Sequence, residues 1–260
     1  MKFEEKVYPF TTEVISGYFP KLNLKEKSIL TVGSSLDHAF NALVLDAKEV
    51  TVYDLNKNIQ ELYHLKKELI LSKNRDELYS ELLDKISIPI TEEELFGKES
   101  VSKMNCYLRD DYSYNKLREK LKNNNNNNNN ISFINGNIFD MNNYLQDKSY
   151  DRIIFSNVLQ YLDKFSKENS KRDFIIEQFE QWQNHLNKDG IIQLLYLYSY
   201  NKNNIEKNAK DVIKYLCTKS LQVETFHDPI NNKEDAIVTY TKRKWYHERY
   251  HSYSRSYRSR

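Results

Sequence analysis

The segment 28–56 constrains the fold more than any other part of the chain. It contains an apolar run that ends at Val32, a break at Gly33, an apolar helical pattern over 39–45 and a second apolar run that ends in Asp54. Two short apolar runs joined by a helix-length segment are typical of strand, turn, helix and strand in a parallel sheet. The sequence therefore predicts a βαβ unit.

The geometry of such a unit predicts a nucleoside site at its carboxyl edge. Gly33 permits a close turn, and the helix that follows directs backbone N–H groups toward the crevice. Asp54 lies about twenty residues further on, at the tip of the neighbouring strand, where a carboxylate can accept ribose hydroxyls. The full GxGxxG pattern is absent. An ordinary strand–helix turn, with Asp54 as a helix N-cap, is the alternative.

Strand and helix patterns repeat along the rest of the chain and predict the fold class. We expect α/β architecture: a doubly wound, mostly parallel seven-stranded sheet with a terminal antiparallel hairpin and a helical insertion. A helix is expected at 170–186 and another at 205–217. The further strands are expected at 131–134, 150–157, 191–198, 221–226 and 236–241.

We expect one domain over 1–241, followed by a basic Tyr- and Arg-rich tail. Residues 73–122 carry helical patterns without strand-like alternation and are predicted to form the insertion. Residues 123–130 are an unbroken Asn run. Asn is a poor former of both helices and strands, so this low-complexity run is predicted to be a surface loop. The tail, 242–260, is either a disordered end or a weak contact for anionic phosphates or lipids.

Charge and composition exclude several classes of protein. A net charge of +2 gives no strong field for binding nucleic acid. Cys106 and Cys217 are too far apart for metal-ligand spacing, so no metal site is expected. No signal-peptide core and no run of about 18 apolar residues is present. We expect a soluble, cytoplasmic protein without a transmembrane segment, and oligomeric state is not predicted.

The N-terminal segment predicts a helix that starts near residues 11–13. Thr11 or Thr12 can serve as the cap, and Glu13 places an acid in the first turn. The apolar positions that follow predict a helix that covers one face of the sheet. The alternative is a lid whose Thr11, Thr12 and Tyr18 touch the ligand.

Four segments resemble the class I S-adenosylmethionine-dependent methyltransferases. In that family a Gly-containing turn follows the first strand, an acid ends the second, a polar segment ending in Asp follows the third, and a polar tip ends the fourth. The resemblance covers roughly 28–72 and 131–241, and it implies S-adenosyl-L-methionine as cofactor. The matching segments are VGSS at 32–35, VYDLN at 52–56, GNIFD at 136–140 and FSNVLQYL at 155–162.

A narrower similarity links the chain to the 3-amino-3-carboxypropyl transferases related to betaine-lipid synthase. The runs TVGSSLDHAFNAL and VTVYDLNKNIQELYHLKKELI, with the SNVLQYL corner, carry it. The resemblance implies a transferase acting on a small-molecule or lipid acceptor. It leaves open whether the methyl group or the aminocarboxypropyl group is transferred.

The resemblance implies a set of cofactor-binding residues at four strand tips. Gly33 and Ser35 would line the methionine end, and Asp37 would hold the ammonium or else cap the helix over 37–46. Asp54 would accept the ribose hydroxyls. The full set is Gly33, Ser34, Ser35, Asp37, Asp54, Leu55, Asn56, Asn137, Ile138 and Asn157.

The remaining corner is expected to meet the adenine and the reacting sulfonium. Asn137 would contact the adenine through its side-chain amide, and Ile138 through its backbone N–H. Asn157 would face the sulfonium, or would cap the strand end. No catalytic base stands out, because His38 and His64 are the only histidines near the predicted site. A cofactor-binding module without chemistry and an NAD-dependent oxidoreductase are the alternative functions.

Overall fold

The computed structural model describes residues 7–86, 96–123, 130–158, 171–195, 221–228 and 233–241. The predicted helix at 205–217, the tail at 242–260 and most of the Asn run lie outside these residues.

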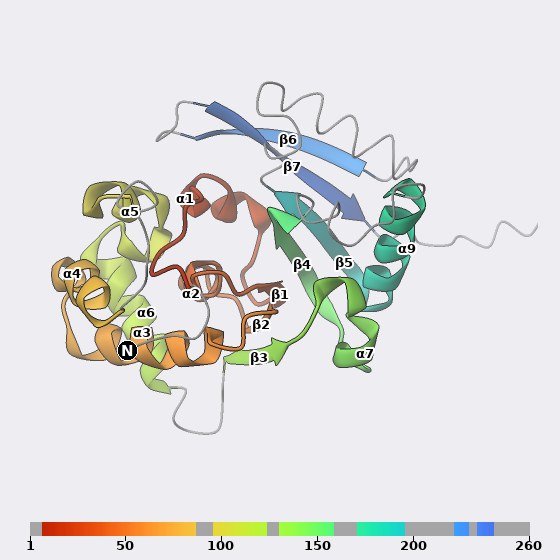
Figure 1. Cartoon of the computed structure of the whole chain (residues 1–260). Helices are drawn as coiled ribbons and strands as arrows, with labels where there is room; N and C mark the ends of the chain where they lie inside the picture. The colour runs from red at the N-terminus through yellow and green to blue at the C-terminus, as the bar shows by residue number, and fades with distance from the viewer. Residues whose placement is uncertain are drawn as a thin grey trace, which may run out of the picture.

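Within the described residues, seven strands form one sheet in the order β3-β2-β1-β4-β5-β7-β6. The first five run parallel, and β7 pairs antiparallel with both β5 and β6. Figure 1 shows the β6–β7 hairpin at one end of the sheet. The arrangement confirms the predicted doubly wound, mostly parallel sheet with a terminal hairpin. The strands are β1 (Ser28–Val32), β2 (Glu49–Asp54), β3 (Ile131–Asn135), β4 (Tyr150–Ser156), β5 (Leu186–Leu195), β6 (Leu221–Asp228) and β7 (Lys233–Thr241).

The strand order places a topological switch point between β1 and β4. The chain runs outward from β1 to β2 and β3, then returns to β4 on the other side of β1. The loops that follow β1 and β4 therefore leave in opposite directions, which is where open α/β sheets bind ligands.

Helices cover both faces of the sheet, as Figure 1 shows. On one face lie α2 (Asp37–Val44), α3 (Ile59–Ser72) and the helices of the insertion, and on the other lie α7 (Asn142–Leu145) and α9 (Lys171–Asn184). Ile29 and Leu30 of β1 are both fully buried, in two different hydrophobic cores. This explains why β1 is a continuous apolar run, because neither of its faces meets water.

The insertion is helical where it is described. It contains α4 (Arg75–Lys85), α5 (Lys98–Met104), the 3-10 helix η3 (Cys106–Leu108) and α6 (Asp111–Asn123). The start of α4 is fixed by a capping box between Asn74 and Glu77. Helix α6 packs against α2 and α3, so the insertion extends the helical layer on that face. Within the described ranges, no helix combines the length and the apolarity that a membrane crossing requires.

The N-terminal helix begins later than predicted. Helix α1 spans Ile15–Tyr18 and passes into the 3-10 helix η1 (Phe19–Leu22), and its N-cap residue, Val14, makes no side-chain capping bond. The predicted Thr cap is therefore wrong. The side-chain oxygen of Thr11 instead accepts a hydrogen bond from the backbone N–H of Glu13, at 3.0 Å. Long-range contacts of residues 9–13, described below, hold this segment out of the helix.

The strand β5 also begins earlier than the predicted 191–198. It starts at Leu186, and its pairing with β4 shifts register between Tyr150 and Arg152. Gly190 permits this arrangement, because a Cβ atom there would lie 2.8 Å from the backbone oxygen of Tyr150. Such a close approach depends on tertiary pairing, so the apolar pattern alone did not reveal it.

Trp182 organises the core between the sheet and α9. Its side chain is buried, with its ring centroid 4.4 Å from that of Phe155 and 5.1 Å from that of Phe179. Its indole N–H donates to the backbone oxygen of Ile138 at 3.3 Å. Helix α9 thereby supports the 3-10 helix η4 (Ile138–Asp140), which follows β3.

We expect Trp182→Ala to lower the free energy of unfolding by about 3–5 kcal/mol, because it leaves a large cavity between β4 and α9. Urea denaturation followed by circular dichroism measures the change. Asn184→Ala, at an exposed position of the same helix, should change stability by less than about 0.5 kcal/mol. Equal effects of the two variants would contradict the role given to Trp182.

Candidate cofactor site

The turn after β1 and the carboxylate that ends β2 lie against each other. The backbone N–H of Ser34 donates to Oδ2 of Asp54 at 2.8 Å. A Cβ atom on Gly33 would lie 2.6 Å from the same oxygen. Residue 33 has to be glycine because the carboxylate occupies the space that a side chain would need. The first two predicted site segments therefore meet at one point.

The second carboxylate oxygen of Asp54 holds the beginning of the next loop. Oδ1 accepts the backbone N–H of Asn56 at 2.8 Å, and the side chain of Asn56 accepts the N–H of Asn58 at 2.9 Å. The residue at the N-cap of α3 is Asn58, so the alternative that Asp54 caps this helix is wrong. Leu55, between them, is 59% exposed at the strand tip.

Two non-glycine residues of the β1 turn have left-handed backbone conformations. The φ angle is 46° at Ser34 and 70° at Leu36. Such a conformation costs about 1–2 kcal/mol for an L-residue. Leu36 is fully buried, so packing holds it in this conformation. The turn is therefore shaped by its surroundings rather than by additional glycines.

A buried ammonium lies beneath this turn and fixes it. Nζ of Lys66, on α3, donates to the backbone oxygens of Pro9 and Ser35 at 2.9 Å each, and to Oδ1 of Asp37 at 2.5 Å. All three N–H bonds of the ammonium thus have acceptors. Burial lowers the pKa of Lys66, and the Asp37 carboxylate acts in the opposite direction.

Asp37 belongs to this buried cluster. Its carboxylate also accepts the backbone N–H of Thr11 at 2.6 Å and the hydroxyl of Tyr107 at 2.8 Å. Its side chain is fully buried. Burial, followed by the charge of Asp37, raises the pKa of Tyr107 well above its ordinary value. We call Lys66, Asp37, Thr11 and Tyr107 the Lys66 cluster.

This placement corrects both predictions for Asp37. Its two oxygens face protein donors in the interior, so we assign it to the support of the turn rather than to the ammonium of a cofactor. It does not cap α2 either, because the N-cap residue is Leu36 and no side chain makes the capping bond. Ser35 is likewise buried, and its backbone oxygen binds Lys66. The sequence shows Lys66 only as one more position of an amphipathic helix.

The corner after β3 is joined to β2. The side-chain amide of Asn135 donates to the backbone oxygens of Asp54 and Leu55, at 3.0 and 2.9 Å. Asn137 caps η4 by accepting the N–H of Phe139 at 3.0 Å, and its backbone oxygen accepts the hydroxyl of Tyr53. Asn137 is thus joined to β2 through Tyr53, and the contacts of Asn137 and Ile138 with adenine stay a prediction. Asn135 is not among the residues that the sequence predicted.

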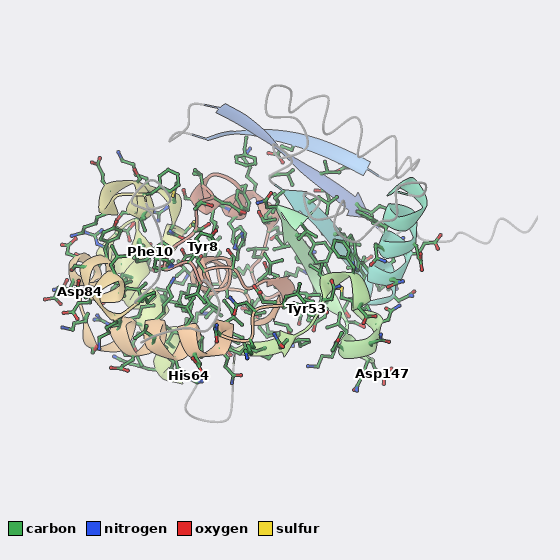
Figure 2. The ribbon with its side chains drawn as sticks, in the orientation of Figure 1. Tyr8, Phe10, Tyr53, His64, Asp84 and Asp147 are labelled. Atoms are coloured by element: carbon green, nitrogen blue, oxygen red, sulfur yellow. The ribbon has the colours of Figure 1, made fainter. Side chains whose placement is uncertain are left out.

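The side chain of Tyr53 supports the corner after β3. Its ring packs edge-on against that of Tyr144 on α7, with centroids 6.4 Å apart. Tyr53 and Phe10, both labelled in Figure 2, belong to different hydrophobic cores. Burial raises the pKa of Tyr53 above its usual range. The phenol therefore stays protonated and serves as a hydrogen-bond donor.

The corner after β4 brings together four polar side chains from distant parts of the chain. We call Glu13, Tyr18, His38 and Ser156 the Glu13 cluster. Oε2 of Glu13 lies 3.1 Å from the hydroxyl of Tyr18 and 3.0 Å from Nε2 of His38, and it accepts the hydroxyl of Ser156. The hydroxyl of Tyr18 also lies 3.0 Å from Nε2 of His38.

Asn157 follows this cluster at the end of β4. Its φ angle is 56°, and its backbone N–H donates to the oxygen of Leu195 at 3.0 Å. This backbone bond joins the tips of β4 and β5, and the predicted contact of Asn157 with a sulfonium stays a prediction. His64 is exposed on α3 and takes no part in the cluster. Among the described residues, no group of three or more His, Cys, Asp or Glu could hold a metal ion.

Comparisons with known proteins give only distant structural likenesses. No family model matches the sequence, and no curated protein matches it. A putative S-adenosylmethionine-dependent methyltransferase from Streptococcus mutans is 14% identical with a TM-score of 0.44, and the match covers 88% of this chain and 46% of that chain. The chain thus spans about half the length of that protein.

Two further solved structures are comparably distant. The N-methyltransferase NodS from Bradyrhizobium japonicum WM9, in complex with S-adenosyl-l-homocysteine, is 12% identical with a TM-score of 0.43, covering 86% of this chain and 84% of that chain. A methyltransferase from Pyrococcus furiosus is 11% identical with a TM-score of 0.46, covering 92% and 88%. TM-scores this low do not identify a function. A function has to be inferred from the contacts at the strand ends.

We expect Lys66→Met to lower the free energy of unfolding by about 3–5 kcal/mol, because it leaves the Asp37 carboxylate buried without its cation. Lys48→Met, at an exposed position, is the matched control and should change stability by less than about 0.5 kcal/mol. Urea denaturation of both variants measures the difference. A small loss for Lys66→Met would show that the turn does not depend on the buried ammonium.

Proposed function

We propose that this protein binds S-adenosyl-L-methionine at the carboxyl edge of its sheet and transfers a group from it to a small-molecule or lipid acceptor. The contact between the Ser34 backbone N–H and Asp54, next to the switch point of the sheet, carries the proposal. A Gly turn and an acidic strand tip that meet around one point have the geometry that an adenosine ribose needs.

The ribose is proposed to bind Asp54. A carboxylate has about four lone-pair positions, and the ribose hydroxyls would share them with the N–H donors of Ser34 and Asn56. Leu55 is exposed at the same tip, and its apolar side chain would pack against the adenine. The methionine end would extend past Gly33 toward Asn157.

The proposed transfer requires alignment of the reactants more than it requires reactive side chains. A sulfonium is already a strong electrophile, so the site has to position an in-line attack and exclude water. Methyl transfer is our first candidate. Transfer of the aminocarboxypropyl group is the second, and the Asp54–Leu55–Asn56 tip with the sequence pattern of α3 favours it.

We expect Asp54→Asn to weaken the binding of both S-adenosylmethionine and S-adenosylhomocysteine by at least about tenfold, because hydrogen bonds to a charged carboxylate contribute about 1.5–3 kcal/mol. Titration calorimetry measures both affinities. Asp147→Asn is the matched control, since Asp147 is exposed at the periphery of the molecule (Figure 2). The proposal would be refuted if the unmodified protein bound neither compound at millimolar concentration. Binding of NADH in their place would favour an oxidoreductase.

We expect the reaction with a panel of amine, hydroxyl and lipid acceptors to yield S-adenosylhomocysteine, the product of methyl transfer. Liquid chromatography of the adenosyl products measures it. Methylthioadenosine in its place would establish aminocarboxypropyl transfer. Cofactor binding with neither product across the panel would indicate a binding module without chemistry.

A further inference from the structure

The Glu13 cluster is a buried group of proton-bearing side chains at the edge where the candidate site lies. Ser156 is the last residue of β4, and His38 is the second residue of α2, which follows the Gly33 turn. The cluster therefore lies where the tips of β1 and β4 adjoin. The Lys66 cluster beneath the turn does not share any of these side chains.

The donors around Glu13 converge on one of its two oxygens. The hydroxyls of Tyr18 and Ser156 both reach Oε2. Nε2 of His38 is 3.0 Å from the same atom, and it donates to Oε2 in the tautomer that carries a proton on Nε2. In that tautomer, three donors reach Oε2.

The other oxygen of Glu13 is the one left to act on a ligand. No donor to Oε1 occurs within the parts of the chain that the structure describes. The side chain keeps 10% of its surface exposed, against 1% for His38. Nδ1 of His38 is buried and has no hydrogen-bond partner among the residues that the structure describes. An unpartnered buried nitrogen costs free energy, so the cluster is held together at some cost to stability.

We propose that Glu13 is the catalytic base of the site, with His38, Tyr18 and Ser156 as positioning residues that direct its Oε1 toward the reacting centre. This inference rests on the proposed function and specifies its acceptor. The acceptor attacks through a nitrogen or oxygen that bears hydrogen.

The proposed step balances in atoms and charge. A lone pair of the acceptor forms a bond to the carbon next to the sulfonium, the carbon–sulfur bond breaks, and its electron pair leaves the sulfur as a neutral thioether. The proton of the acceptor moves to Oε1 of Glu13, which becomes a neutral carboxylic acid. The three donors on Oε2 need not move, because that oxygen still accepts hydrogen bonds. The proton then leaves to solvent.

Three adenosyl ligands that differ in charge at the sulfur position test whether the Glu13 carboxylate lies at the reacting centre. S-adenosylhomocysteine has a neutral sulfur, and S-adenosylmethionine has a fixed positive charge at that position. Sinefungin places an amine where the transferred methyl group would be. A carboxylate at the reacting centre favours the two cations over the neutral ligand.

We expect Glu13→Gln to weaken the binding of S-adenosylmethionine and of sinefungin by at least about tenfold, which corresponds to about 1.4 kcal/mol. The binding of S-adenosylhomocysteine should weaken by less than about twofold. Calorimetry with the full chain gives all three affinities. Glu61→Gln, an exposed position on α3, should change none of them. Ser156→Ala keeps the carboxylate but removes one of the donors that position it, so it should lower the preference for cations by less than Glu13→Gln does.

The outcomes separate this inference from the function on which it rests. Equal weakening of all three ligands by Glu13→Gln would mean that Glu13 is only structural, and would overturn the inference while cofactor binding stands. No binding of any ligand to the unmodified protein would overturn both. If Glu13→Gln does not fold, as judged by circular dichroism, Glu13→Asp is the second variant. It withdraws the carboxylate by one methylene and should lower the preference for cations.

Discussion

The buried ammonium of Lys66 is the constraint on which the candidate site depends. It joins the N-terminal segment at Pro9, the β1 turn at Ser35 and the start of α2 at Asp37. An ammonium out of water costs several kcal/mol unless every N–H is paired. These acceptors therefore have to stay in place together, and the left-handed conformation of Leu36 between two of them is maintained.

The turn is held from two sides. Lys66 fixes it from the interior, and Asp54 binds the Ser34 N–H from the neighbouring strand tip. A site held in this way needs little rearrangement when a ligand arrives, which favours binding. The N-terminal segment is part of the same structure, because Thr11 binds Asp37 and Glu13 binds the end of β4. The N-terminal segment thus contacts residues of the candidate site, and its role goes beyond that of the predicted helix covering one face of the sheet.

Local patterns predicted most of the framework and the relation between Gly33 and Asp54. Apolar runs reflect strands buried on both faces, and the spacing of a βαβ unit brings its two strand tips together. The same patterns misplaced the start of α1, and the family resemblance assigned Asp37 to a ligand. In both cases the deciding partner, Lys66, lies on another helix, 57 residues from Pro9 and 29 from Asp37.

The sequence by itself determined the βαβ unit, the terminal hairpin and the helical character of the insertion, because burial periodicity is a property of neighbouring residues. Only the tertiary structure decided which polar side chains are buried together in the interior and which lie at the strand tips. Glu13 and Ser156 are 143 positions apart, and no local pattern records such a pairing. Side-chain oxygens and nitrogens find their partners through the fold, after the sheet order has brought distant segments together.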